Sequence, residues 1–209
     1  MYNYRLLLTL LFILSLGTCV RAQTAPPNDD IANATVVSIL PFSEDVAVAD
    51  ASLATDDSAL LDCEDGVHSF WYSLTPTTTG LYRVASGVDG ATEVLPANDL
   101  TLGLFTANDD LTVTATLECE QDDRVDGGGE VFFATLDAGV TYYVRVALVE
   151  ATTGDEVITT TIEYVEEITF TAADNQFWDN PDNWSPARVP TVSDKVIIPE
   201  NADDICFIR

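Results

Sequence analysis

Carboxylates are the side chains through which this sequence is best equipped to do chemistry. Its 209 residues include 35 Asp and Glu against 8 Lys and Arg, and many of the acids fall in short clusters. Carboxylate and amide oxygens on loops are the ligands that calcium takes, roughly six to eight at a time. The clusters are Asn28-Asp29-Asp30, Asp62 with Glu64 and Asp65, Asn108-Asp109-Asp110, and Asp122-Asp123.

None of these clusters has the Asp-x-Asp-x-Asp-Gly spacing of a helix-loop-helix calcium loop. A chain this acidic also forms clusters by chance. Asp and Asn are common in turns because their side chains bond to the nearby backbone. Two interpretations therefore stay open: the clusters bind structural calcium, or they are solvated turns.

Other catalytic chemistry finds little support. His68 is the only histidine, which excludes two-histidine zinc sites and the His-Glu-x-x-His motif. Ser69 and Ser73 lie near it, but no Gly-x-Ser-x-Gly elbow is present, and adjacent residues of a strand face opposite sides. Pairs of carboxylates for glycoside hydrolysis mean little in so acidic a chain. We predict that the protein is not an enzyme.

The charge balance of the sequence excludes two classes of binding partner. The formal net charge is -27, and Lys195 is the only lysine. Nucleic acids and anionic membranes bind proteins through neutralisation of phosphate by Lys and Arg, so we exclude both as partners. Most of the acids are best interpreted as a solvated surface coat.

Residues 1–22 are typical of a secretory signal peptide. Arg5 precedes an apolar run over 6–16, and Val20-Arg21-Ala22 ends in a small residue before Gln23. The run is too short for a membrane helix, which needs about 20 apolar residues, and no later stretch approaches that length. A lipoprotein signal at Cys19 is the alternative, but Thr18 fits it poorly. We expect a secreted chain, or one held at the cell surface, that begins near Gln23.

Three cysteines remain after this cleavage. Outside the cell a disulfide is the default, and Cys63 and Cys119 are the expected pair because both fall in the same predicted domain. In the chain-entropy model such a bridge stabilises by about 4 kcal/mol. Cys206 is then left over, which suggests a partner in further domains C-terminal to this sequence.

The elements that must position these residues are predicted to be strands. Runs rich in Val, Thr, Tyr, Phe and Ile occur at 35–40, 69–74, 81–85, 100–106, 111–117, 131–136, 141–149 and 157–165. Turn residues separate them, and no helical period competes. The sequence therefore predicts an all-β fold, a jelly-roll-like antiparallel β-sandwich of about eight strands over residues 23–167. Residues 168–209, with Trp178 and Trp184, form the start of an incomplete second β module.

Paired aromatics occur on three of the predicted strands: Phe70-Trp71, Phe132-Phe133 and Tyr142-Tyr143. Side chains alternate along a strand, so the two members of a pair cannot both face the same core. The outward members form a carbohydrate platform or pack against a second layer, and packing is the favoured interpretation.

Several of these stretches occur together in an order that resembles the bacterial pre-peptidase C-terminal domain family. They are PNDDIANA at 27–34, FWYSL at 70–74, LGLF at 102–105, LEC at 117–119 with DD at 122–123, and GVTYYVRV at 139–146. A second set looks like a module of large secreted surface proteins of Bacteroidetes-type bacteria. It comprises FWDNPDNWS at 177–185, VP at 189–190 and DKVIIP at 194–199.

The resemblance implies a β-sandwich that assists binding, folding or secretion. In calcium-binding relatives the N-terminal motif supplies ligands, which carries over to Asn28 and Asp29. The relatives also have an aspartate directly before the aromatic strand, where this sequence has Ser69. The acids close to that position are Asp62, Glu64 and Asp65, so these five residues are the candidate calcium ligands.

Three functions follow, in order of preference. The first is a non-catalytic binding or adhesion module for extracellular protein or polysaccharide, with calcium at its N-terminal edge. The second is an accessory domain of a secreted peptidase or other hydrolase whose catalytic part is absent from this sequence. The third is a structural spacer.

Overall fold

Burial alternates along most strands of the protein, and this alternation assembles them into layers. In β7 (Glu130–Leu136) every second side chain is buried, whereas Phe133 and Thr135 face solvent. In β9 (Val157–Tyr164) residues Ile158, Thr160 and Ile162 are buried in the same way. A strand with one apolar face must bury that face against another layer. The computed structural model describes residues 22–56, 63, 66–89, 100–120, 129–150, 156–171, 173, 177–191 and 194–199.

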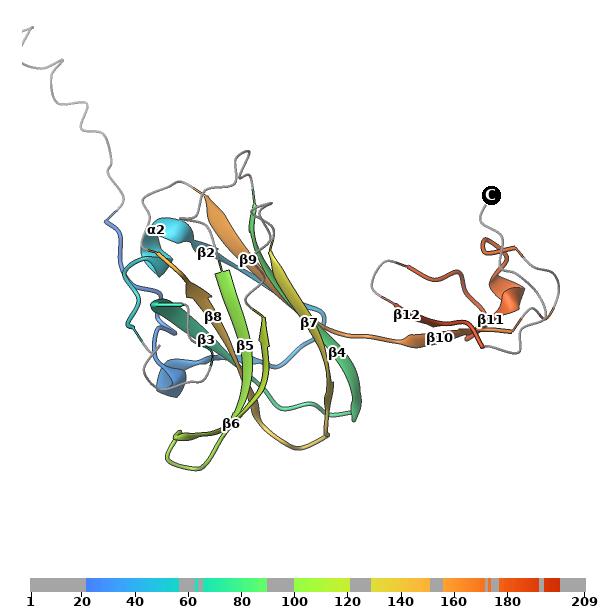
Figure 1. Cartoon of the computed structure of the whole chain (residues 1–209), viewed down its shortest axis with the longest axis horizontal. Coiled ribbons are helices and arrows are strands. Elements are labelled where there is room, and N and C mark those ends of the chain that lie inside the picture. The colour runs from blue at the N-terminus through green and yellow to red at the C-terminus, as the bar shows by residue number, and fades with distance from the viewer. Residues whose placement is uncertain are drawn as a thin grey trace, which may run out of the picture.

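Two sheets face each other in a β-sandwich (Figure 1). The five-stranded sheet has the order β1-β3-β8-β5-β6, formed by β1 (Thr35–Val37), β3 (His68–Leu74), β8 (Tyr142–Leu148), β5 (Leu100–Ala107) and β6 (Val113–Glu120). The four-stranded sheet has the order β2-β9-β4-β7, where β2 is Phe42–Ala47 and β4 is Gly80–Asp89. The all-β sandwich expected from the sequence is confirmed.

Two details differ from expectation. β2 is a strand beyond those predicted, and its sequence, FSEDVA, was not recognised because polar and acidic residues fill half of it. The sandwich is also not wholly antiparallel, since β1 runs parallel to β3. The chain between these two strands passes through β2 in the other sheet, and a crossover of this kind is what permits a parallel pair.

The main core lies between the two sheets. Its members are apolar residues of both inner faces, among them Phe70, Leu102, Val144, Val84 and Ile162. A smaller cluster of Trp71, Phe105 and Cys63 lies on the outer face of the five-stranded sheet. Because of this second layer, β3 and β8 are buried on both faces over most of their length.

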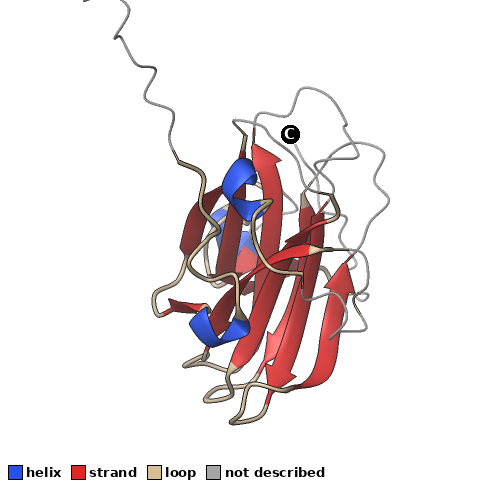
Figure 2. Cartoon of the chain, turned by 90° about the vertical axis from the view of Figure 1, so that its left-hand side faces the viewer, coloured by secondary structure: helices blue, strands red, loops and turns tan. Residues whose placement is uncertain are grey.

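Within the described residues, the helical segments are short and lie beside the sheets (Figure 2). The turn η1 (Ile31–Asn33) lies next to β3, and α2 (Val48–Ala51) follows β2 directly. A third turn, η4 (Pro181–Asn183), belongs to the C-terminal part, where Pro181 occupies the first helical turn. Pro is favoured there because its missing N–H has no partner to lose.

A third sheet follows the sandwich and lies apart from it in Figure 1. It has the order β11-β10-β12, with β10 (Glu167–Phe170) between β11 (Trp184–Ser185) and β12 (Lys195–Ile197). Its own small core consists of Ile168, Phe170 and Trp184, with Trp178 and Val196 packed against them. This region coincides with the second module expected from residue 168 on, and that domain boundary stays a prediction.

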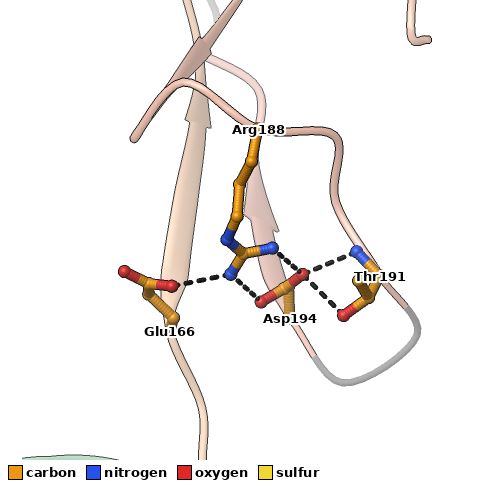
Figure 3. A network of polar contacts seen from close by, with 4 residues as sticks. All are labelled: Glu166, Arg188, Thr191 and Asp194. Carbon is orange, nitrogen blue, oxygen red and sulfur yellow. Dashed lines mark hydrogen bonds and ion pairs between the residues drawn. The ribbon is translucent and has the colours of Figure 1, made fainter. Parts of the chain in front are cut away.

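An ion-pair network lies beside β10 and β12 (Figure 3). Arg188 donates two hydrogen bonds to Asp194, of 2.6 and 2.7 Å, and a third of 2.7 Å to Glu166. Thr191 donates to the same carboxylate through its amide and its hydroxyl, at 2.6 and 2.8 Å. The hydrogen bonds from Arg188 are the main cause that holds the pKa of Asp194 well below its usual range.

Candidate functional site

Asn28, an expected calcium ligand, has a structural role in this fold. The residue is 3% exposed, and its side-chain amide donates a 2.8 Å hydrogen bond to the Trp71 carbonyl. Its own carbonyl accepts a 2.8 Å bond from the Trp71 amide. β1 pairs with β3 only over Tyr72–Leu74 of that strand, so Asn28 extends the pairing by one residue. The amide thereby contributes a hydrogen bond to a buried backbone carbonyl.

Of the other four expected ligands, Asp29 is the one that falls within the described residues. Asp30 caps η1 by accepting a 2.8 Å bond from the Ala32 amide. The backbone carbonyl of Asp29 accepts a 3.0 Å bond from the Thr55 hydroxyl. Asp62, Glu64 and Asp65 lie outside the described residues. Within the described part of the chain no group of three or more His, Cys, Asp or Glu is placed to hold a metal ion, so calcium binding stays a prediction.

The cluster at 108–110 forms a turn between β5 and β6. The Thr112 amide donates to Asn108 Oδ1 and to Asp110 Oδ1, each at 3.0 Å. Hydrogen bonding by Thr112 is also what lowers the pKa of Asp110. Asn108 and Asp110 are exposed, and this arrangement is that of a solvated turn. The fourth cluster, Asp122-Asp123, lies outside the described residues.

A small acidic pocket lies at the N-terminal edge of the sandwich, between the segment before η1 and the edge strand β2. Its volume is about 380 Å³, and its lining is Thr24, Ala25, Pro26, Pro27, Asn28, Glu44, Asp45, Val46, Ala47, Asp50 and Val157. Ligand pockets span roughly 300–1,000 Å³, so this one is at the small end. Its charged lining residues are three acids, with no Lys or Arg. We refer to it as the edge pocket.

Two of the three carboxylates of the edge pocket already accept hydrogen bonds. Asp50 Oδ1 accepts from the Thr24 amide at 3.2 Å, which ties the N-terminal segment to α2. Asp45 Oδ1 accepts from the Thr159 hydroxyl at 2.8 Å. Glu44 differs from both, because its Oε2 is buried and has no hydrogen-bond partner among the described residues.

Glu44 belongs to a row of polar residues that crosses the inner face of the four-stranded sheet. It stands opposite Thr160, which in turn stands opposite Ser86, and the hydroxyls of Thr160 and Ser86 are 3.1 Å apart. From the other sheet the fully buried Tyr72 approaches this row, close to Thr160 and Glu44. Its hydroxyl reaches neither of them with hydrogen-bond geometry in the part of the chain that is described.

Burial keeps the tyrosine of this row protonated. It is the main cause that raises the pKa of Tyr72 far above its usual value; Thr160 opposes this rise, and the nearby Glu44 and Asp45 add to it. Tyr72 therefore keeps the proton of its hydroxyl, which lies beside the Glu44 carboxylate. A buried polar group without a partner costs about 1–3 kcal/mol, so a small movement that lets this hydroxyl donate to Glu44 would be favourable.

Sequence reasoning missed Glu44 because it missed β2. The signal was present as alternation: Phe42, Glu44 and Val46 are half-buried, whereas Ser43 and Asp45 are exposed. Reading the segment as a strand would have placed Glu44 on the inner face with Phe42. Asn28 is the one predicted site residue that lines the edge pocket.

The paired aromatics form no platform in the described structure. Trp71, the outward member of its pair, packs against Phe105 with ring centroids 5.7 Å apart, beneath the segment at Cys63. Tyr143 packs against the same cluster. Phe133 alone among the six is exposed, at 51%. Packing against a second layer, the favoured interpretation, accounts for the pairs Phe70-Trp71 and Tyr142-Tyr143.

The expected disulfide pair, Cys63 and Cys119, is joined in the structure. The bridge joins Cys63 to β6, and the fully buried Arg145 of β8 donates to the carbonyls of Cys63, at 3.3 Å, and Gly66. Gly103 leaves room in this layer, because a Cβ there would lie 2.6 Å from the Phe105 ring. A buried cation that donates to backbone carbonyls is a structural feature of this face.

His68 is held by the backbone. Its Nδ1 lies 2.9 Å from the Ala54 carbonyl, and Ser69 is fully buried with its hydroxyl 3.5 Å from the Thr55 carbonyl. Both side chains thus contact backbone carbonyls of the segment that ends at residue 56. Among the described residues no helix combines the length and hydropathy that crossing a membrane requires.

The chain has distant similarity to several solved structures. No family model matches it, and no curated protein matches its sequence. The solved structures similar to it include the pre-peptidase C-terminal domain of a collagenase from Bacillus anthracis, with 11% identity over 62% of this chain and 94% of that one and a TM-score of 0.35.

Two further solved structures are similar at the same distance. A surface-associated copper-binding protein from Methylomicrobium album shares 8% identity over 68% of this chain and all of that one, with a TM-score of 0.40. An adhesin domain of Lys-gingipain from Porphyromonas gingivalis shares 13% identity over 45% of this chain and 60% of that one, with a TM-score of 0.29. Similarities this distant do not extend to a ligand or an activity.

Proposed function

We propose that this chain is exported and that its sandwich is a non-catalytic module that binds an extracellular protein or polysaccharide. The observation that carries the proposal is the edge pocket, whose charged lining residues, Glu44, Asp45 and Asp50, are all acids. A pocket with a few convergent polar groups is the usual form of a binding site. His68 contacts the Ala54 carbonyl through Nδ1, which is a structural contact.

The test is binding of the secreted chain to arrays of glycans and of extracellular matrix proteins. The pocket variant is Glu44→Gln, and its matched control is Glu118→Gln, which makes the same charge change on β6 at the far edge of the other sheet. We expect at least one ligand class that the wild type and Glu118→Gln bind and Glu44→Gln binds less well. A folded chain that binds nothing on either array would contradict the proposal and favour a structural spacer.

A further inference from the structure

Four strands form the edges of the two sheets of the sandwich, and one of them, β7, lacks the protection that the others have. The backbone N–H and C=O groups along an edge can pair with a further strand, and proteins prevent this with short, charged or bulged edge strands. β1 has three residues. β2 carries Glu44 and Asp45, and the pairing of β6 with β5 contains register shifts. These three edges are poor sites for adding a strand.

β7 is long, regular and uncharged along most of its length. It spans seven residues and pairs with β4 without a register shift, from Glu130 opposite Ser86 to Leu136 opposite Gly80. The residues after Glu130 are VFFATL, with no charge, Pro or Gly. Among the described residues no strand pairs with its other side. An edge strand of this kind favours pairing with another strand.

The outward side chains of β7 also favour a neighbour. Val131, Phe133 and Thr135 share the outer face of the sheet. Phe133 is 51% exposed, more than any other aromatic side chain in the described part of the chain. Beside it Arg83 forms a 3.0 Å ion pair with Glu163, so this part of the face has no net charge. A strand added along β7 would bring a side chain next to the Phe133 ring and cover part of it.

We propose that β7 pairs with β7 of a second copy of this chain, antiparallel about a two-fold axis at Phe133. The strand is self-complementary about this residue. Phe133 meets its own counterpart, Val131 meets Thr135 of the other copy, and Glu130 meets Leu136. The two Glu130 side chains then lie at opposite ends of the pair, about 20 Å apart. Each copy offers one such edge, so the association closes at a dimer.

Charge favours a second copy over other occupants. With a net charge of -27 the chain attracts basic proteins, but these would bind where acids gather, and β7 has no acid beyond Glu130. Two copies of so acidic a chain repel each other, so they pair only through a surface with little charge. β7 is such a surface. Because the other acids still oppose association, the dimer should be weak and should strengthen as salt screens the repulsion.

This dimer would leave the edge pocket open. β2, which lines that pocket, is the strand farthest from β7 in the sheet. In the joined sheet the two β2 strands are the outer edges, about 34 Å apart at the usual spacing between strands. The inference goes beyond the proposed function and does not depend on it, although two pockets on one dimer would make binding there bivalent.

The test is sedimentation equilibrium of the secreted chain, from roughly 10 μM to 1 mM and at about 0.15 M and 1 M salt. The edge variant is Phe133→Lys, and its matched control is Val36→Lys on β1, where Val36 is 72% exposed. We expect the wild type and Val36→Lys to approach twice the monomer mass, more readily at high salt. Phe133→Lys should raise the dissociation constant at least tenfold, because it places two like charges opposite each other.

The two variants make the same charge change, and a less negative chain repels its copies less. Weaker association of Phe133→Lys alone is therefore an effect of position. A chain that stays monomeric at every concentration and in both salts would overturn the inference. So would a dimer that Phe133→Lys leaves unchanged, equal weakening by both variants, or a mass that grows beyond the dimer.

A second variant tests the register and does not depend on a charge in the strand. Residues directly opposite in an antiparallel pair have Cα atoms about 4.5–5.5 Å apart, which suits a disulfide. Phe133→Cys should therefore link two copies on oxidation, whereas Val36→Cys should not. All chains carry Cys206→Ser, so that this cysteine forms no link, and thermal unfolding separates lost association from lost folding. A dimer without the link at position 133 would refute the proposed pairing.

Discussion

Substitution of Asn28 distinguishes a structural amide from a calcium ligand. Its side-chain NH₂ donates to the Trp71 carbonyl, so the group that matters here is a donor. A calcium ligand, by contrast, acts through an oxygen. Asn28→Asp removes the donor and adds a better calcium oxygen, whereas Asn28→Ala removes both. The two interpretations therefore predict opposite outcomes for Asn28→Asp.

The magnitude follows from the burial of this contact. Asn28 is 3% exposed and the bond is 2.8 Å long, so the substitution removes a buried hydrogen bond from the Trp71 carbonyl. Such a loss costs about 1–3 kcal/mol, and more when a charge is left facing an acceptor. In a protein of this size each 1 kcal/mol lowers the melting temperature by roughly 2–4 °C. We expect Asn28→Ala to lower it by about 4–8 °C and Asn28→Asp by more.

The assay is thermal unfolding in chelator and in millimolar calcium, at neutral pH and at pH 4. Protonation restores a donor to the new carboxyl group, so its pKa in the folded state should be raised. Compared with the wild type at the same pH, the stability of Asn28→Asp should therefore be highest at low pH and fall as pH rises through that pKa. A wild-type melting temperature for Asn28→Asp in chelator would refute the structural role. A calcium-dependent rise that Asn28→Ala and Asp29→Ala abolish would establish the predicted metal site.

Three further outcomes are expected. Cys63→Ser with Cys119→Ser opens a bridge that spans 56 residues, and should cost about 4 kcal/mol by unfolding in denaturant; a cost near zero would contradict it. Gly103→Ala puts a Cβ 2.6 Å from the Phe105 ring and should lower the free energy of unfolding in denaturant by about 1–3 kcal/mol. No loss would mean that the ring moves aside. Because the pKa of Asp194 is lowered, its contribution to the stability of the fold is present above an ordinary carboxyl pKa of about 4 and is lost as pH falls below that value. Asp194→Asn should therefore weaken the loss of stability in acid, followed by tryptophan fluorescence. An unchanged dependence on pH would contradict this expectation.

The residue pattern predicted much of the sandwich because alternation is a local property. Runs of Val, Thr and aromatic residues marked the strands, and the rule that adjacent side chains face opposite ways correctly separated Phe70 from Trp71 and Phe132 from Phe133. The pattern did not reveal that Trp71 is covered by a second layer. It also placed β6 at 111–117 instead of Val113–Glu120, since the turn extends through Leu111, which has a φ of 65°.

The predicted calcium site and the edge pocket share one described residue. The N-terminal motif suggested a site at this edge of the sandwich, and Asn28 does line the edge pocket. The acids of that pocket come from β2 and α2, which the acid clusters of the sequence did not single out. Glu44 was hidden because a strand with polar residues at half its positions resembles a loop when it is considered alone.

The sequence by itself determined the acidic composition, the all-β class and the choice of Cys63 and Cys119 as a pair, and it supports the prediction of export. The composition is a residue count, and the β class follows from a period of two, which neighbouring residues determine. The cysteine pair followed from that predicted domain, and the prediction of export rests on residues 1–22 alone. Only the tertiary structure decided that Asn28 bonds to Trp71, 43 residues away, and that Glu44 lies close to Tyr72 of the opposite sheet. Such meetings depend on strand register and on how two sheets stack, and both are set by contacts between distant parts of the chain.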